Sequence, residues 1–193
     1  LLQDLSMSMF LRKGWGVGAL LVLAGVSSAA DIDLVKTYGV LDANRRLVVL
    51  GTAQAFAESA RKERLFDGDV ATFFDADPAG ANSTWAGFRT TRPVIPTRIR
   101  YAGRDGYESR AASCVFQGAN KADFSDAVAL HVVAPPAKWK GRDWVEVALD
   151  WSAVRGGPQA FTHFRVLGPP GRVGYDAGAC CGNFSELQFF GVE

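Results

Sequence analysis

The sequence predicts an all-β protein, an antiparallel β-sandwich of the jelly-roll kind. Its 193 residues include 21 glycines and 13 phenylalanines but only two methionines, a composition that suits a loop-rich β protein better than a helical bundle. Short runs with strand-like patterns follow one another to the C-terminus, and turn-forming residues separate them. Many short strands between frequent turns are typical of sandwiches and jelly rolls.

Several short runs are expected to form the strands. In Trp144–Leu149 and Phe161–Val166, apolar and polar side chains alternate with a period of two, as in half-buried strands. Turn chemistry lies between runs, for example at Asp67–Asp69 and Gly168–Gly171. Only Ala53–Arg64 could form a helix, and it would be short. The expected strands are Leu47–Leu50, Thr84–Phe88, Ile95–Tyr101, Cys114–Gln117, Ala127–Val133, Trp144–Leu149, Phe161–Val166 and Glu186–Phe190.

Residues 1–30 have the pattern of a few upstream residues and a signal peptide. The basic pair Arg12–Lys13 precedes an apolar run from Trp15 to Val26, and Ser28 and Ala30 are small residues of the kind found at cleavage sites. A membrane anchor is the alternative, but the run is shorter than the roughly 20 residues that span a bilayer. We therefore expect a secreted or cell-surface protein, cleaved near Ala30, with a short lead-in over 31–46 and one domain over 47–193.

The charge balance argues against a nucleic-acid partner. The formal net charge is +1, and removal of residues 1–30 leaves equal numbers of basic and acidic side chains. A neutral chain lacks the electrostatic footprint that polyanion binding requires. With 48% hydrophobic and 21% charged residues, the composition is that of a globular chain rather than a disordered one.

The cysteines and histidines carry little chemistry. A secreted protein meets an oxidising compartment, so Cys114 is free to pair with either Cys180 or Cys181, which leaves one thiol over. A metal site is less favoured, because adjacent cysteines rarely face one ion and no CxxC spacing occurs. His131 and His163 each lie in a strand-like apolar run, where a packed or surface histidine is the favoured interpretation.

Four stretches of the sequence together carry a family pattern. They are F-D-G-D-V-A-T-F-F-D from Phe66 with Trp85–Phe88, I-R-Y-A-G-R from Ile99, Arg110 with F-Q-G-A-N from Phe116 and D-F-S from Asp123, and C-G-N-F-S-E-L-Q-F-F-G from Cys181. In this order they resemble the discoidin family of coagulation factor V/VIII C-type domains. The resemblance covers residues 47–193 and implies the galactose-binding-like fold that also houses family 32 carbohydrate-binding modules. Gly103 replaces the usual proline, and the loop Gly171–Gly182 is extended, so binding specificity does not carry over.

The acidic turn near the first of these stretches suggests calcium. Oxygen-rich, sulfur-free side chains around a glycine are the ligands that calcium selects. The resemblance implies a structural calcium ion held by Asp67, Asp69, Thr72 and Glu186. A plain polar turn is the alternative, and Asp75 and Asp77 are expected to face solvent.

The resemblance places ligands among the loops at one end of the sandwich. Sugar binding uses an aromatic ring with polar side chains that bond the hydroxyl groups. The ligand-binding candidates are Arg104, Tyr107, Arg110, Asn120, Trp139 and Phe184. Arg110 and Asn120 could instead tie neighbouring loops together, and Trp85, Trp144 and Trp151 are expected in the core.

These observations predict a non-catalytic module that binds a glycan or polysaccharide. A glycosidase needs two carboxylates flanking the scissile bond, whereas the acids here crowd one loop, and no hydrolase motif occurs. An adhesion or structural module that binds protein or phospholipid is the alternative, and Lys138–Lys140 is the one place suited to a membrane. The sequons at Asn82 and Asn183 matter only in a eukaryotic source.

Overall fold

The computed structural model describes residues 31–53, 55–76, 83–134, 140–152, 154, 156–168 and 183–193. Its strands are β1 (Ile32–Asp33), β2 (Val49–Gly51), β3 (Trp85–Gly103), β4 (Val115–Ala119), β5 (Val128–Val132), β6 (Trp144–Ala148), β7 (Phe161–Leu167) and β8 (Phe184–Val192). One α-helix, α1 (Leu34–Tyr38), and the 3-10 helices η1 (Glu58–Ala60), η2 (Lys62–Phe66) and η3 (Glu108–Ala111) complete the described elements. The predicted all-β class is confirmed, with each expected strand present at shifted bounds.

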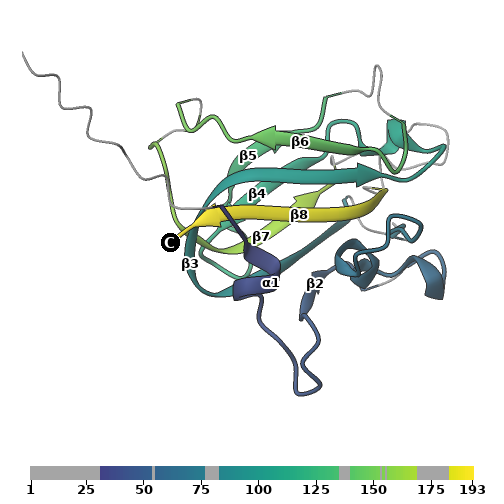
Figure 1. Cartoon of the computed structure of the whole chain (residues 1–193), viewed down its shortest axis with the longest axis horizontal. Helices are drawn as coiled ribbons and strands as arrows, with labels where there is room; N and C mark the ends of the chain where they lie inside the picture. The colour runs from purple at the N-terminus through teal and green to yellow at the C-terminus, as the bar shows by residue number, and fades with distance from the viewer. Residues whose placement is uncertain are drawn as a thin grey trace, which may run out of the picture.

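The long strand β3 joins the two layers of the sandwich. Its first half pairs with β2 and β7, and its second half pairs with β6 and β8, all antiparallel. The register shifts between Arg89 and Val94, where the strand passes from one layer to the other. The strands predicted at Thr84–Phe88 and Ile95–Tyr101 are therefore one continuous strand, and Figure 1 shows it turning between the layers.

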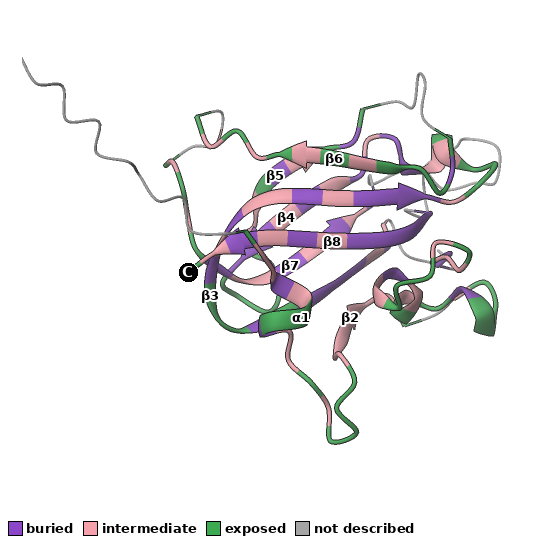
Figure 2. Cartoon of the chain, in the orientation of Figure 1, coloured by how far each residue is buried: buried purple, intermediate pink, exposed green. Residues whose placement is uncertain are grey.

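Phenylalanine rings from both layers fill the space between them. Phe88 of β3 stacks on Phe164 of β7 with ring centroids 5.3 Å apart, and both contact Phe189 of β8 at 5.4 Å. Phe116 of β4 lies 5.4 Å from Tyr101 of β3 and 5.7 Å from Phe189. Figure 2 shows the buried residues concentrated on β3, β7 and β8, which makes one aromatic core.

The lead-in over residues 31–46 is part of the packed domain. Asp33 caps α1, since its carboxylate accepts hydrogen bonds from the backbone N–H groups of Val35 and Lys36, each at 3.1 Å. Leu34 is fully buried and Tyr38 nearly so, while β1 adds a strand beside β8. The packed unit thus begins before Leu47, because Leu34 and Tyr38, four residues apart on one face of α1, enter the core.

The segment expected to be helical forms two 3-10 helices. Ala60 and Arg64 each donate a backbone hydrogen bond three residues back, to Ala57 and Arg61. Arg61 itself is extended, with ψ at 156°, so it separates η1 from η2 and prevents a continuous helix. No helix in the described part of the chain is long and apolar enough to cross a membrane.

The tryptophans divide between core and surface. Trp151 packs against the core and donates its indole N–H to the carbonyl of Pro96 at 2.9 Å. Trp85 is half-buried, whereas Trp144 is 36% exposed on the outer face of β6. The expectation of a core position is therefore wrong for Trp144.

The aromatic core predicts a large effect of truncation. Replacement Phe164→Ala removes a fully buried ring that contacts three others and should lower the free energy of unfolding by about 3–5 kcal/mol. The matched control is Val132→Ala, whose side chain is 55% exposed and should change stability by less than about 0.5 kcal/mol. Urea denaturation measures both, and a loss below about 1 kcal/mol for Phe164→Ala would contradict this packing.

Candidate functional site

A buried ion pair organises the loops where β3 ends. Asp75 is 7% exposed, and its carboxylate accepts a hydrogen bond from Arg104 Nη1 at 2.6 Å. The side chain of Asn183 completes the group, since its Oδ1 accepts from Arg104 at 3.0 Å and its Nδ2 donates to Asp75 at 3.2 Å. Three loops distant in the sequence are thereby joined. Asp75 was expected to face solvent, and that expectation is wrong because the carboxylate neutralises a partly buried arginine.

Two guanidinium groups flank the exposed ring of Tyr107. Arg104 Cζ lies 4.1 Å and Arg110 Cζ 4.4 Å from the centre of that ring, and Arg104 also lies 3.8 Å from the ring of Phe73. Arg110 Nη1 lies 3.8 Å from Asp75, which draws the second arginine toward the same carboxylate. Tyr107 is 39% exposed, so this cluster holds an aromatic side chain at the surface in a fixed position.

A small pocket opens beside this cluster, with a volume of about 220 Å³. Two arginines, Arg104 and Arg142, and the aromatic residue Tyr107 are among the residues that line it. It therefore has hydrogen-bond donors that are always charged and an aromatic side chain, whereas the hydroxyl group of Ser185 is buried and donates to the carbonyl of Gly103 at 3.2 Å. Its residues are Val70, Ala71, Phe73, Arg104, Asp105, Tyr107, Arg142 and Ser185.

The structure brings together three of the predicted ligand-binding residues: Arg104, Tyr107 and Arg110. Phe184 is fully buried against Tyr101 and Phe116, so the expectation that it contacts ligand is wrong. Trp139 and the predicted turn residue Asp77 lie outside the described residues.

The expectation that Asn120 contacts ligand is also wrong, because Asn120 follows β4 at the opposite end of the sandwich. Its side chain donates to the carbonyl of Ala160 at 3.1 Å and accepts from the backbone of Thr162 at 3.1 Å. It therefore ties two loops together, as the structural alternative had it.

Four residues of this site were not predicted, because their signals in the sequence are weak. Phe73, Asp75, Asn183 and Arg142 all belong to the cluster or its pocket. Three of them, Phe73, Asp75 and Asn183, lie in stretches that carry the family resemblance, but a sequence pattern in a loop does not show which side chains turn inward. Arg142 has φ at 72°, a left-handed conformation that pattern analysis does not detect.

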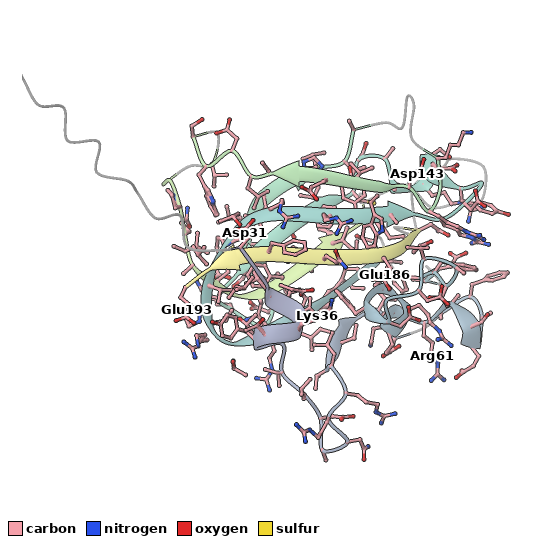
Figure 3. The ribbon with its side chains drawn as sticks, in the orientation of Figure 1. Asp31, Lys36, Arg61, Asp143, Glu186 and Glu193 are labelled. Carbon is pink, nitrogen blue, oxygen red and sulfur yellow. The ribbon has the colours of Figure 1, made fainter. Side chains whose placement is uncertain are left out.

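Three of the four predicted metal ligands, Asp67, Asp69 and Thr72, lie in one loop beside β8, and the fourth, Glu186, lies on β8 itself. Gly68 N–H donates to Glu186 Oε1 at 2.6 Å, and the Thr72 hydroxyl group donates to Asp67 Oδ2 at 2.9 Å. The side chain of Asp69 instead accepts from the backbone of Ala71 at 2.9 Å. Figure 3 shows Glu186 on β8 beside the segment that carries η2.

Glu186 has an unusual ionisation. It is 2% exposed, and burial, with the neighbouring Asp67 carboxylate, raises its pKa to about 8. Glu186 is buried and its neighbour Asp67 lies at the surface, so two acids meet where the loop contacts β8, and a cation would stabilise both in their charged forms. Among the described residues, no group of three His, Cys, Asp or Glu side chains is arranged to hold a metal, so any calcium here would also need hydroxyl or backbone oxygens.

The cysteine and sequon predictions fall partly outside the described residues. Cys114 is fully buried, and burial raises the pKa of its thiol to about 12, which makes it unreactive. Cys180 and Cys181 lie outside the described residues, so a disulfide between Cys114 and one of them stays a prediction. Asn183 is fully buried in the loop cluster, which leaves its side chain no room for a glycan.

The Asp75 ion pair predicts a strong dependence of stability on that carboxylate. Replacement Asp75→Ala leaves Arg104, whose side chain is 20% exposed, without its counterion and should cost about 3–5 kcal/mol. Glu58→Ala breaks an ion pair with Arg61 in which both side chains are well exposed, and should cost less than about 1 kcal/mol. Equal losses for the two variants, measured by thermal unfolding, would contradict the assignment of Asp75 as the central group.

Comparison with solved structures identifies the fold. The CBM62 module of Clostridium thermocellum Xyl5A is 35% identical, with a TM-score of 0.59, over 75% of this chain and 94% of that one. A CBM32 pair from Clostridium perfringens ZmpB, solved with GalNAc, is 14% identical, with a TM-score of 0.52 over 82% and 36% of the two chains. An F5/8 type C domain from Bacteroides fragilis is 16% identical, with a TM-score of 0.50 over 81% and 97%.

No protein-family profile and no curated protein matches this sequence. The two more distant structures establish the fold alone, and they confirm the predicted discoidin-like, galactose-binding-like architecture. The identity to the CBM62 module extends over nearly all of that module. The chain therefore belongs to the family of that CBM62 module, as a carbohydrate-binding module with the discoidin-like fold.

Proposed function

We propose that this protein is a secreted, non-catalytic module that binds a single sugar ring of a glycan or polysaccharide in the pocket beside Tyr107. The observation that carries the proposal is the pair of guanidinium groups, from Arg104 and Arg110, that fixes an exposed tyrosine at the edge of a small pocket. A preorganised aromatic side chain beside fixed donors lowers the ordering cost of binding.

The chemistry of the pocket suits a hexose. The guanidinium groups donate to ring hydroxyl groups, and the tyrosine ring packs against the apolar face of the sugar. A volume of about 220 Å³ is small for an oligosaccharide and suits one ring at a chain end or on a branch. The GalNAc complex of the CBM32 neighbour supports a galactose-type sugar as the first ligand class to test.

The positions of the carboxylates in this region favour a binding role over a catalytic one. Asp75 is held by two arginines and Asn183, so it is committed to structure. Glu186 and Asp67 share one site, whereas glycosidases keep their two carboxyl groups about 5–9.5 Å apart across a bond. The CBM62 and F5/8 type C neighbours are binding modules, which supports the same conclusion.

A calcium ion is proposed to stabilise the loop that precedes this pocket. The Asp67 and Glu186 carboxylates would hold it, with the Thr72 hydroxyl group and backbone oxygens near Asp69, and it would supply positive charge to two crowded acids. The raised pKa of Glu186 supports this proposal, because the proton occupies a place that a cation could take. Export behind residues 1–30 would bring the site into a calcium-rich medium, and this too is proposed from the sequence pattern alone.

The sugar proposal predicts a loss of glycan binding in Tyr107→Ala. The protein is screened against a glycan panel and anionic vesicles, with calcium and with EDTA, and the best glycan is then titrated by calorimetry. Removal of the ring should weaken binding at least about tenfold, whereas Tyr107→Phe should keep most of it. Leu41→Ala, an exposed apolar residue on the hairpin before β2, is the control and should bind like the parent. Binding to vesicles alone, or glycan binding that Tyr107→Ala leaves unchanged, would exclude this site.

The calcium proposal predicts proton release on binding. A folded-state pKa of about 8 means that Glu186 carries about 0.9 proton at pH 7, and calcium must displace it. Calorimetry in two buffers of different ionisation enthalpy counts that proton, and the count should fall to about 0.1 at pH 9. Without calcium, the proton on Glu186 stabilises the fold fully below its unfolded pKa, near 4.5, and this contribution is lost as the pH rises through about 8.

Two matched variants distinguish calcium binding at Glu186 from a general effect of negative charge. Glu186→Gln should abolish both calcium binding and its proton release, while Glu63→Gln, an exposed acid in the neighbouring η2, should preserve both. Calcium binding with no proton release at pH 7 would contradict the role given to Glu186.

A further inference from the structure

Three basic side chains gather on the outer face of the sheet formed by β3, β7 and β4. Arg89 of β3 is directly opposite His163 of β7, and Arg165 of β7 is directly opposite Gln117 of β4. Residues two apart on a strand share a face, so Arg165 and His163 lie on the same side. The opposite side of these strands carries Phe88 and Phe164 of the core, which places the basic group on the solvent side. We call Arg89, His163, Arg165 and Gln117 the basic face.

The two arginines of this face have no carboxylate partner in the described part of the chain. Each of the other described arginines, apart from Arg45 on the hairpin before β2, forms an ion pair with an Asp or Glu side chain. On the other sheet, for example, Arg98 and Arg100 share Glu146. The basic face is thus a local excess of positive charge on a protein whose net charge is only +1.

Arg165 is held in place, although no anion neutralises it. Its Nε donates to Gln117 Oε1 at 2.7 Å, and its guanidinium group lies 4.1 Å from the ring of Phe124 and 5.4 Å from that of Trp85. Burial lowers the pKa of Arg165, which shows that its charge is partly removed from water. A fixed, partly desolvated guanidinium group binds an incoming carboxylate or sulfate more strongly than a mobile surface arginine.

Asp126, the acid that acts on His163, already has hydrogen-bond donors from the chain. Asp126 accepts hydrogen bonds from the backbone N–H groups of Asn120 and Lys121, at 3.2 and 3.1 Å, and so caps their loop. His163 has a pKa below its usual value, because of burial and of the nearby charge of Arg89, although Asp126 acts in the other direction. It is therefore neutral at pH 7 and offers a polar ring to a hydroxyl group rather than a further charge.

We propose that the basic face is a second binding surface, separate from the pocket beside Tyr107, and that it takes an acidic oligosaccharide with carboxylate or sulfate groups on its rings. Charge complementarity selects this ligand: Arg89 is exposed, Arg165 is fixed, and neither has a counterion on the described surface. Arg165 opposes Gly87, two residues from Arg89, so the two arginines are diagonal neighbours roughly 7–8 Å apart along the sheet. One flexible chain with charges on successive rings can reach both.

The test uses oligogalacturonate as the carboxylate probe, its methyl ester as the uncharged control, and a heparin-derived oligosaccharide as the sulfated probe. Binding is measured by calorimetry at low and at physiological ionic strength. An acidic probe should bind, its methyl ester should not, and salt should weaken the complex. Because the whole chain is nearly neutral, long-range attraction contributes little and the affinity should be modest.

Arginine variants locate the surface. Arg89→Gln should weaken binding of the acidic probe about tenfold, while Arg45→Gln removes the same charge from the distant hairpin and should change it less than about twofold. Arg165→Lys keeps the charge but loses the planar fork and the bond to Gln117, and it should weaken binding without unfolding the sheet. Equal effects of Arg89→Gln and Arg45→Gln, or equal binding of the methyl ester, would overturn the proposal.

The two surfaces are tested independently. Tyr107→Ala should leave binding of the acidic probe unchanged, and Arg89→Gln should leave binding of a neutral glycan unchanged. If Tyr107→Ala abolishes both, a single site takes both ligands and the basic face is excluded as a second surface. If neutral glycans fail to bind while the acidic probe binds in an Arg89-dependent way, the pocket proposal fails and the basic face stands.

Discussion

The whole domain depends on one strand that serves both layers. Because β3 pairs with β7 through its first half and with β8 through its second, the separation of the layers is set where the strand bends, between Arg89 and Val94. As a result, Phe88 in the first half of β3 and Ile99 in the second half are both buried between the two layers. The end of β3 also delivers Arg104 to the loops, so the strand that positions the core positions the candidate site as well.

This arrangement explains which parts of the fold were predictable from the sequence. Alternation finds a strand whenever one face is buried and the other is wet, and β7 has that pattern. It fails for the start of β8, where four consecutive residues from Phe184 to Leu187 are buried. The loop before β3 covers the outer face there, and Phe74 donates a backbone hydrogen bond to Phe184. Phe184 therefore looked like a loop residue from its neighbours in sequence, although a distant segment covers it.

The candidate site shows the same division between local and distant information. Arg104, Tyr107 and Arg110 lie within one short segment that carries part of the family resemblance, and proximity in sequence was enough to group them. Asp75 and Asn183 belong to the same cluster only because two other loops converge on Arg104. No periodicity marks such residues, since a buried carboxylate and a turn aspartate have the same sequence context until the counterion is known. The structural role of the Asn183 amide could not be predicted either, because the sequence around it matches a glycosylation sequon.

The Tyr107 pocket and the basic face differ in how their charges are paired. Near the Tyr107 pocket, every charge has a partner, and the pairing holds loops in place so that one aromatic ring stays exposed. On the basic face the balance is reversed, because Arg165 of β7 is held by an amide from β4 and by two aromatic rings, but by no anion in the described part of the chain. A fold that had only to be stable would gain from a carboxylate at Gln117, directly opposite that arginine, or at Ala129, one strand further along the same sheet. The neutral residues at both positions leave the positive charge available to a ligand, whereas beside β8 the protonated acid of Glu186 lies next to the charged carboxylate of Asp67.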